Sequence, residues 1–269
     1  MIFKLKIKLL KFLNKILNQF NVNLDLSVKK KKLIKLLNKL KPHDLGYDLI
    51  RIGSENDGGY LVPNILNEIK VCFSPGTGNN TQFEKDLINR NIETFLADGT
   101  INEKDIKLDN FHFTKKNLAS YESEKTLTLE NWVNDNAKDS TNLLLQMDIE
   151  SSEYEVVHAT SEECLKKFKI IVIEFHYIEK INNHYFYENF NNTINKLLLN
   201  FEISHIHANN CQGTYSINGI ILPTAIEVTF LRKDLCKYKK NINFFPHKLD
   251  QRNIINLPDV SLPKEIINY

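Results

Sequence analysis

Strand-like apolar runs alternate with helical segments along most of this sequence, and no other feature restricts the fold as much. The strands are expected within residues 69–78, 92–100, 110–119, 142–150, 169–176, 202–210 and 225–234, and the helices within 81–91, 126–137, 151–168 and 185–201. Strands that alternate with helices of this length indicate βαβ units and a mainly parallel sheet. Two further short strands are expected around a turn at residues 56–59.

The last two expected strands are joined by a segment without a helical pattern, so they should pair in antiparallel fashion. We therefore predict a three-layer αβα, Rossmann-like fold whose mostly parallel seven-stranded sheet contains one antiparallel strand. The content of 42% hydrophobic and 25% charged residues is that of an ordinary globular domain, which we assign to residues 42–269. The four cysteines are scattered and include no C-x-x-C pair, which fits a reducing compartment and favours a cytoplasmic protein.

Residues 1–41 form a basic extension that differs from the rest of the chain. They contain twelve Lys and one Asp, a charge of +11, so the remaining residues must carry −9 to give the net charge of +2. An acidic body argues against nucleic acid as the main partner.

The extension is expected to form two helices. Residues 1–20 place Lys4, Lys8, Lys11 and Lys15 on one face and Leu, Ile and Phe side chains on the opposite face, and a second basic helix should span 28–41. Lysines interrupt the apolar stretch that a signal peptide would need. Two interpretations remain open. The first helix docks on an anionic membrane surface, the inner face for a cytoplasmic protein, or both helices pack on the domain or on a second subunit.

The stretch VCFSPGTGNN, residues 71–80, predicts a ligand-binding turn between a strand and a helix. Gly76 and Gly78 let the backbone turn sharply and approach a ligand closely. A Walker loop would need a Gly-Lys-Ser/Thr sequence here, and the dinucleotide fingerprint would need a third glycine where Thr81 stands. A nucleoside without phosphates fits better, because Asp98 at the end of the next strand can accept hydrogen bonds from both ribose hydroxyls. A tight loop without a ligand is the alternative.

The segment NLLLQMDIESSEYEVV, residues 142–157, resembles a sequence block of the FkbM-type S-adenosylmethionine-dependent methyltransferases, a class I methyltransferase family. The segments RIGSENDGGYLVP, CFSPGTGNNTQFE, IVIEFH, HIHANN and AIEVTFLRK are similar to further blocks of the family, in the same order. The resemblance implies a class I methyltransferase fold that binds S-adenosylmethionine over Ser74, Gly76 and Gly78, with the ribose on Asp98. It also implies a small-molecule acceptor, often a sugar hydroxyl in a surface polysaccharide, glycolipid or secondary metabolite.

Two positions depart from the pattern of this family. An acidic residue is common two positions before the first glycine, where this chain has Ser74. Either Ser74 weakens one contact to the methionine end of the cofactor, or Glu84 supplies that contact. The glycine usual after the D-I-E triplet is Ser151, which we expect to tighten the packing without changing the chemistry.

Polar residues at three strand ends are the candidates for the reaction centre. Asp148 ends one strand, Glu174 and His176 end the next, and His207 lies near the end of the third. Methyl transfer to a hydroxyl needs a base or a metal to assist deprotonation, so we assign catalytic roles to Asp148, His176 and His207. We expect Asp148, Glu174 and His176 to converge, with His207 across the acceptor pocket. A resemblance to metal-dependent O-methyltransferases implies a divalent cation on Asp148, Glu174 and His176; without a cation, a histidine acts alone as the base.

Two other functions remain open. Asp148-Ile149-Glu150 imitates the D-x-D metal site of a GT-A-like glycosyltransferase, although the glycine loop and Asp98 would then have no role. The other alternative is a non-catalytic cofactor-binding subunit that docks through its N-terminal helices.

Overall fold

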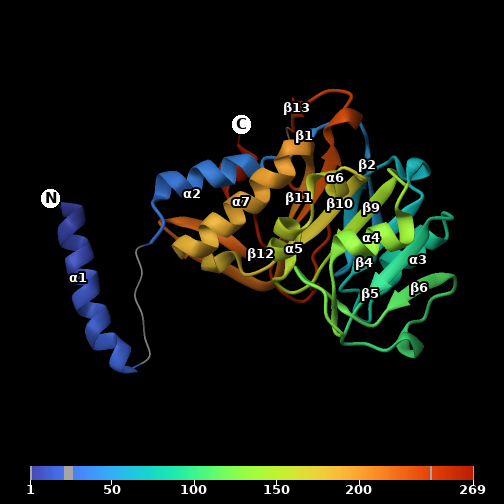
Figure 1. Cartoon of the computed structure of the whole chain (residues 1–269). Helices are drawn as coiled ribbons and strands as arrows, with labels where there is room; N and C mark the ends of the chain where they lie inside the picture. The colour runs from blue at the N-terminus through green and yellow to red at the C-terminus, as the bar shows by residue number, and fades with distance from the viewer. Residues whose placement is uncertain (1, 21–26, 243, 269) are drawn as a thin grey trace.

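The computed structural model describes residues 2–20, 27–242 and 244–268. Its centre is a seven-stranded sheet with the strand order β11-β12-β10-β9-β4-β5-β6 (Figure 1). β12 pairs antiparallel with β10 and β11, and the other neighbours pair in parallel. The predicted mostly parallel sheet with one antiparallel strand is therefore confirmed.

The elements of this layout follow the apolar runs of the sequence. The strands of the main sheet are β4 (Val71–Pro75), β5 (Glu93–Ala97), β6 (Phe111–Thr114), β9 (Leu143–Met147), β10 (Phe168–Phe175), β11 (Phe201–Ile217) and β12 (Ile220–Arg232). The helices between them are α3 (Gln82–Ile88), α4 (Leu129–Ala137), α5 (Glu153–Ala159), α6 (Glu162–Leu165) and α7 (His184–Asn200).

Smaller elements complete the structure. Three short strand pairs are β2 (Leu49–Gly53) with β3 (Gly59–Pro63), β1 (His43–Asp44) with β13 (Lys240–Asn241), and β7 (Asn117–Leu118) with β8 (Thr126–Leu127). A last helix, α8, spans Lys264–Ile267. Short 3₁₀ helices cover Asn18–Phe20, Asn38–Leu40, Leu66–Glu68, Glu103–Asp105, Ile178–Asn182 and Lys233–Leu235.

Two hydrophobic clusters cover the two faces of the main sheet. Ile171 and Ile173 of β10 belong to one cluster, whereas Ile170 and Val172 belong to the other, because successive strand residues point to opposite faces. The first cluster includes side chains of α4, α5, α6 and α7, and the second includes those of α3 and the β2–β3 hairpin. The domain therefore has three layers, with the hairpin completing the layer of α3.

Two elements differ from the expectation. The helix expected over 151–168 is divided into α5 and α6, because the Ser161 hydroxyl accepts a hydrogen bond from the Cys164 backbone N–H and starts a new helix. The expected loop between the last two strands is a continuation of β11 and β12, which meet at Asn218 and Gly219. Both residues have positive φ, 54° and 77°, as a tight Asn-Gly hairpin turn requires.

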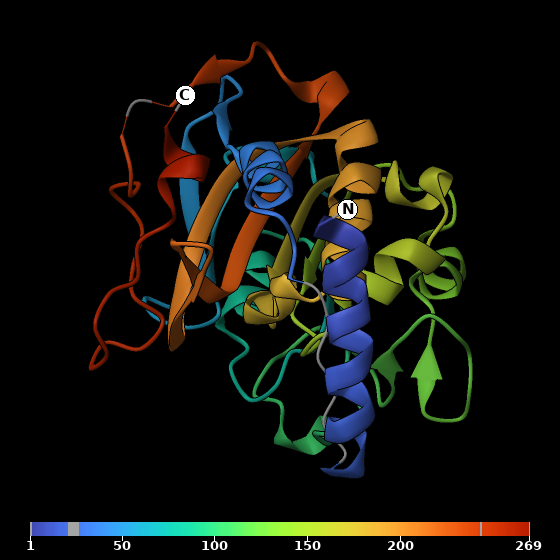
Figure 2. The same cartoon turned by 90° about the vertical axis from the view of Figure 1, so that its left-hand side faces the viewer.

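The two N-terminal helices have different surroundings. α2 (Lys30–Leu37) packs on the domain through Leu33, Leu36 and Leu37, which belong to the first hydrophobic cluster. α1 (Ile2–Leu17) lies apart from the body in Figure 1. Figure 2 views the molecule from the side on which α1 lies. The part of residues 1–41 that stands outside the domain is thus α1. No helix in the described ranges has the length and apolar character needed to cross a bilayer.

Candidate active site

A cavity of about 530 Å³ opens at the carboxyl ends of β4, β5 and β9, where ligands bind in open α/β sheets. Its lining joins the glycine loop, the end of β5 and the turn after β9. The lining residues include Asp57, Gly76, Gly78, Glu84, Asp98, Gln146, Asp148 and Glu150. Five of the predicted cofactor and reaction residues therefore share one cavity.

The glycine loop adopts left-handed backbone conformations, which favour glycine. Gly76 and Gly78 have φ values of 80° and 57°. A Cβ atom on Gly76 would lie 1.6 Å from the carbonyl oxygen of Asp148, so any side chain would push β4 and β9 apart. A Cβ on Gly78 would meet nothing within 4 Å. Gly78 therefore leaves open space on the cavity side that a ligand can occupy.

Asp98 ties the end of β5 to the glycine loop. Its Oδ2 accepts a hydrogen bond of 3.0 Å from the Gly78 backbone N–H. Its Oδ1 accepts bonds from the backbone N–H and the hydroxyl of Thr100, at 2.7 and 2.6 Å. Because a carboxylate offers about four acceptor positions, one remains for a ligand in the cavity.

Ser74, Glu84 and Gln146 form a buried polar group beneath the cavity. The Ser74 hydroxyl lies within hydrogen-bond distance of Glu84 Oε1 and 2.6 Å from Gln146 Oε1. Glu84 Oε2 is buried and has no hydrogen-bond partner among the described residues. Burial raises the pKa of Glu84 to about 7, against a smaller lowering by the bond with Ser74. Glu84 is thus an acceptor that still lacks a donor, and a cationic donor group would suit it.

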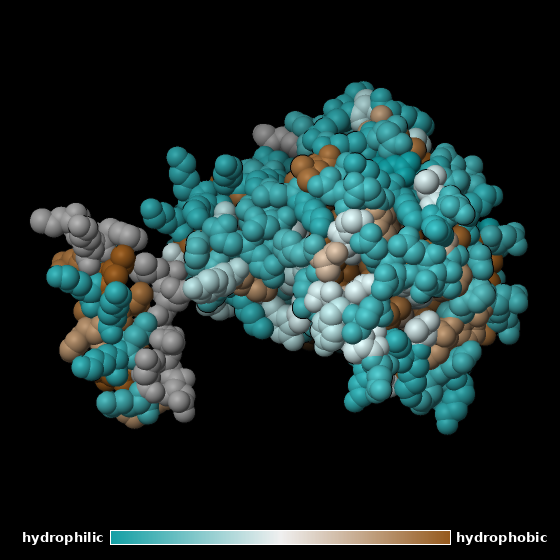
Figure 3. Space-filling view, in the orientation of Figure 1, coloured by the Kyte–Doolittle hydropathy of each residue, from teal (hydrophilic) through white to brown (hydrophobic). Residues whose placement is uncertain are grey.

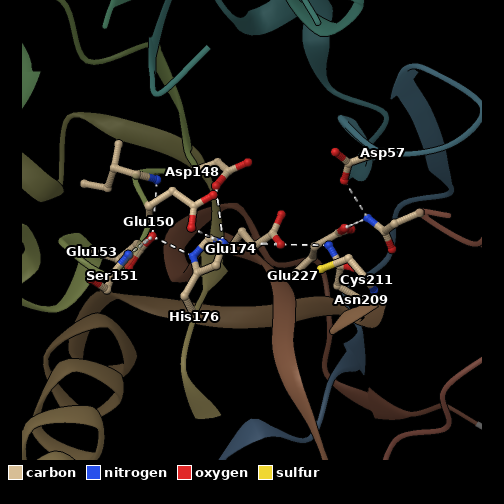
Figure 4. Close-up of polar contacts among 12 residues, drawn as sticks. Asp57, Asp148, Glu150, Ser151, Glu153, Glu174, His176, Asn209, Cys211 and Glu227 are labelled. Atoms are coloured by element: carbon tan, nitrogen blue, oxygen red, sulfur yellow. Dashed lines mark hydrogen bonds and ion pairs between the residues drawn. The ribbon is translucent and has the colours of Figure 1, made fainter. Parts of the chain in front are cut away.

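His176 is the centre of a second polar group at the ends of β9 and β10 (Figure 4). Its Nδ1 lies 2.9 Å from Oε1 of the fully buried Glu153. A carboxylate on Nδ1 directs the other ring nitrogen away from Glu153. Nε2 accordingly faces Asp148 Oδ1 and Glu174 Oε1, each at 3.6 Å.

Asp148, Glu174 and His176 form a compact ligand set. Their nearest donor atoms all lie within 4.8 Å of one another, so the expected convergence is found; the roles assigned to them stay predictions. Burial raises the pKa of Asp148 to about 7, and burial with the charge of Asp148 raises the pKa of Glu174. Burial lowers the pKa of His176, but the bond with Glu153 and the nearby carboxylates raise it overall to about 8. A proton on Nε2 or a divalent cation can balance these carboxylates.

Buried amides extend this group along the sheet (Figure 4). Asn209 Nδ2 donates to Glu174 Oε1 at 2.8 Å. Asn253 Nδ2 lies 2.6 Å from Glu227 Oε1 and 3.1 Å from Asp57 Oδ1. These polar side chains therefore run from Glu174 on β10 past Glu227 on β12 to Asp57 in the β2–β3 turn. Asp57 also lines the cavity.

The turn after β9 is folded around Glu153. Glu150 and Ser151 have φ values of 53° and 90°. Oε1 of Glu153 accepts hydrogen bonds of 3.2 Å from the backbone N–H groups of Ile149 and Ser151. Ser151 is exposed, so the expectation that it tightens the packing is wrong; it strains the backbone where glycine would not.

We expect Ser151→Gly to stabilise the fold by about 0.5–1 kcal/mol, which should raise the melting temperature by about 1–4 °C. The matched control is Ser152→Gly, because Ser152 has a φ of −80° and gains nothing from glycine. Thermal unfolding followed by circular dichroism compares the two variants. A lower melting temperature for Ser151→Gly than for Ser152→Gly would contradict the strain.

His207 does not face the other three residues across the cavity. It lines a second cavity of about 290 Å³ between β11 and residues 245–267. Its Nδ1 lies 3.7 Å from Oδ1 of Asp250, which also lies 2.9 Å from His205 Nε2. β12 separates β11 from β10, and two strand spacings amount to roughly 10 Å. His207 is therefore outside the group formed by Asp148, Glu174 and His176.

Sequence reasoning missed several members of the site. The sequence did not predict Glu153, Asn253 or Gln146 as members of the site. The sequence signal for Glu153 is its position five residues after Asp148, on the first turn of α5. Asn253 comes from the C-terminal segment, and no local pattern links it to Glu227.

Comparison with known proteins gives one family. The model described as methyltransferase FkbM domain matches residues 46–210. Comparison with curated proteins gave no match.

Solved structures show only distant likeness. A fibrillarin/Nop5p complex shares 9% identity over 61% of this chain and 73% of the other, with a TM-score of 0.37. A candidate RNA methyltransferase from Pyrococcus horikoshii shares 10% sequence identity over 76% of this chain and 99% of the other, with a TM-score of 0.30. A candidate caffeoyl-CoA O-methyltransferase from Staphylococcus aureus shares 9% sequence identity over 85% of this chain and 98% of the other, with a TM-score of 0.30. None of these three informs the choice of substrate.

Proposed function

The chain belongs to the FkbM methyltransferase family, and on that premise we propose that it methylates a hydroxyl group of a sugar or another small molecule with S-adenosylmethionine. The observation that carries this proposal is the single cavity that joins the glycine loop and Asp98 to Asp148, beside Glu174 and His176. Bound S-adenosylmethionine would supply an electrophilic methyl group to an oxygen held at the Asp148 end.

The residues of the cavity fit this cofactor. Gly78 leaves space beside the loop, and Asp98 keeps an acceptor position for a ribose hydroxyl. Glu84 Oε2 has no donor within the part of the chain that the structure describes, and the α-amino group of the methionine moiety is a cationic donor. We assign this contact to Glu84, which would replace the acidic residue absent at Ser74.

The reaction centre fits a divalent cation. Asp148, Glu174 and His176 would hold it, and Glu153 would orient His176. A cation there would stabilise the deprotonated form of the acceptor hydroxyl. Without one, His176 would take the proton itself in its neutral form, which its pKa of about 8 favours only above that pH.

The alternatives have less support. The glycosyltransferase interpretation uses Glu150 as a metal ligand, yet its side chain is 75% exposed and the compact ligand set uses Glu174 instead. Membership of a methyltransferase family also argues against it. The four free cysteines support the reducing environment of the cytoplasm as the location of the activity.

Calorimetric titration with S-adenosylmethionine tests the proposal. We expect the affinity to rise about tenfold between about pH 5.5 and pH 7, because Glu84 must ionise to accept the ammonium group, which itself stays protonated over this range. Glu84→Gln should bind more weakly and lose the pH dependence. Glu124→Gln, an exposed carboxylate outside the cavity, should behave like the native chain.

The outcomes separate the cofactor from its contacts. If the folded protein does not bind S-adenosylmethionine, the proposed cofactor is wrong. Binding of a UDP-sugar instead would favour the glycosyltransferase function. Binding without pH dependence would retain the cofactor but remove Glu84 from the ammonium contact.

A further inference from the structure

α1 and the 3₁₀ turn that follows it, Asn18–Phe20, expose a stripe of large apolar side chains. Leu5, Leu9, Phe12, Leu13, Ile16 and Phe20 are 69%, 57%, 61%, 36%, 45% and 70% exposed. Their spacing of three, four and one residues places them on one side of the helix. Such a contiguous apolar surface is unusual on a soluble protein and marks an interaction site.

Lysines border this stripe. Lys6, Lys8, Lys11 and Lys15 are exposed, and the described part of α1 contains no acidic residue. Figure 3 shows brown and teal surfaces side by side on α1. A helix with apolar residues on one face and lysines around it is the type that lies in the interface of a bilayer.

The charge distribution favours an anionic surface as the partner of α1. Residues 42–269 carry a net negative charge, so they would be repelled by the headgroups, whereas α1 would be attracted to them. Exposed Lys29, Lys30 and Lys31 at the start of α2 add positive charge where the chain enters the domain. α2 itself is fixed to the core, so α1 is the element available to bind a surface.

We propose that α1 docks this protein on the surface of an anionic phospholipid bilayer, with the six apolar side chains inserted and the lysines at the headgroups. The docking is independent of the methyl-transfer reaction. It would restrict the enzyme to two dimensions and bring the catalytic domain close to acceptors made at the membrane.

Co-sedimentation of the full chain with vesicles tests this surface. Vesicles of phosphatidylcholine with roughly 30% phosphatidylglycerol should bind at least about tenfold more protein than pure phosphatidylcholine vesicles, and the difference should shrink as salt rises above about 0.1 M. Leu9→Glu with Phe12→Glu should reduce binding at least tenfold, because it charges the centre of the stripe. Leu199→Glu, at an apolar side chain of α7 that is 56% exposed, should leave binding unchanged.

Three results would overturn the proposal. The first is that the full chain does not bind anionic vesicles. The second is that it binds equally well after substitution of Leu9 and Phe12. The third is that Leu199→Glu weakens binding as much as the substitution of Leu9 and Phe12 does. Sedimentation velocity without vesicles tests the alternative partner, a second copy of this chain. If the chain is a dimer and the Leu9 and Phe12 substitutions convert it to a monomer, the stripe is a contact between copies. An unchanged melting temperature in both variants shows that folding is preserved.

Discussion

Methyl transfer by a His176→Ala variant is expected to be about 10²–10⁴ times slower than by the native chain, with an unchanged affinity for S-adenosylmethionine. The reason is the position of Nε2, which lies 3.6 Å from both Asp148 and Glu174, whereas His176 is outside the lining of the cofactor cavity. Transfer of a labelled methyl group to the acceptor measures the rate. His112→Ala removes an exposed histidine on β6 and should leave it unchanged.

A chelator separates the two explanations for this loss. If a cation assists the reaction, chelation should abolish transfer by the native chain, and Mg²⁺ or Mn²⁺ should restore it. If His176 acts alone as the base, the chelator should have no effect. Equal rates for the native chain and His176→Ala would remove His176 from the reaction centre in either case.

Direct Mn²⁺ titration gives a measurement that needs no acceptor. Glu153→Gln should lower the Mn²⁺ affinity about 10–100-fold, because it removes the carboxylate that orients His176. The same substitution changes neither Asp148 nor Glu174, so two of the three candidate ligands remain in the sequence. If the native chain does not bind Mn²⁺, the proposed cation site is wrong. The proposed cofactor site would not be affected by that result.

The sheet could be predicted because its determinants are local. Apolar runs such as 143–147 and 168–175 are buried on both faces, and the strand–helix alternation sets their parallel pairing. From that order, Asp148 and Glu174 had to meet at one edge, since β9 and β10 are parallel neighbours. The antiparallel pairing of β11 and β12 was predicted, but their continuation to a tight turn was not, although Asn218-Gly219 carries a standard turn signal.

The rest of the site depends on contacts between distant segments. His207 lies in register with Glu227, and Glu227 with Glu174, so strand order alone places all three on one face. The sequence could not show that the C-terminal segment covers this face and supplies Asp250 and Asn253. Glu153 is similar, because its bond with His176 joins residues 23 positions apart.

Asp98→Ala is expected to weaken S-adenosylmethionine binding by about 1.5–3 kcal/mol, or roughly 10–150-fold. Two losses contribute to this figure. The ribose loses a charged acceptor, and the glycine loop loses the bond from the Gly78 N–H to Oδ2. Thr100→Val, which removes one hydroxyl bond to Oδ1 and keeps the carboxylate, should cost less than about 1 kcal/mol.

A double-mutant cycle with a deoxyribose analogue of the cofactor distinguishes the two losses. If Asp98 binds a ribose hydroxyl, removal of that hydroxyl should weaken binding to the native chain but make little difference to Asp98→Ala. If Asp98 only holds the loop, removal of the hydroxyl should reduce the binding free energy equally for the native chain and for Asp98→Ala. A coupling near zero would therefore leave Asp98 as a support of Gly78, and native affinity in Asp98→Ala would exclude it from the cofactor site altogether. The first outcome is the expected one, because an acceptor position of Asp98 remains open beside the space that Gly78 leaves in the cavity.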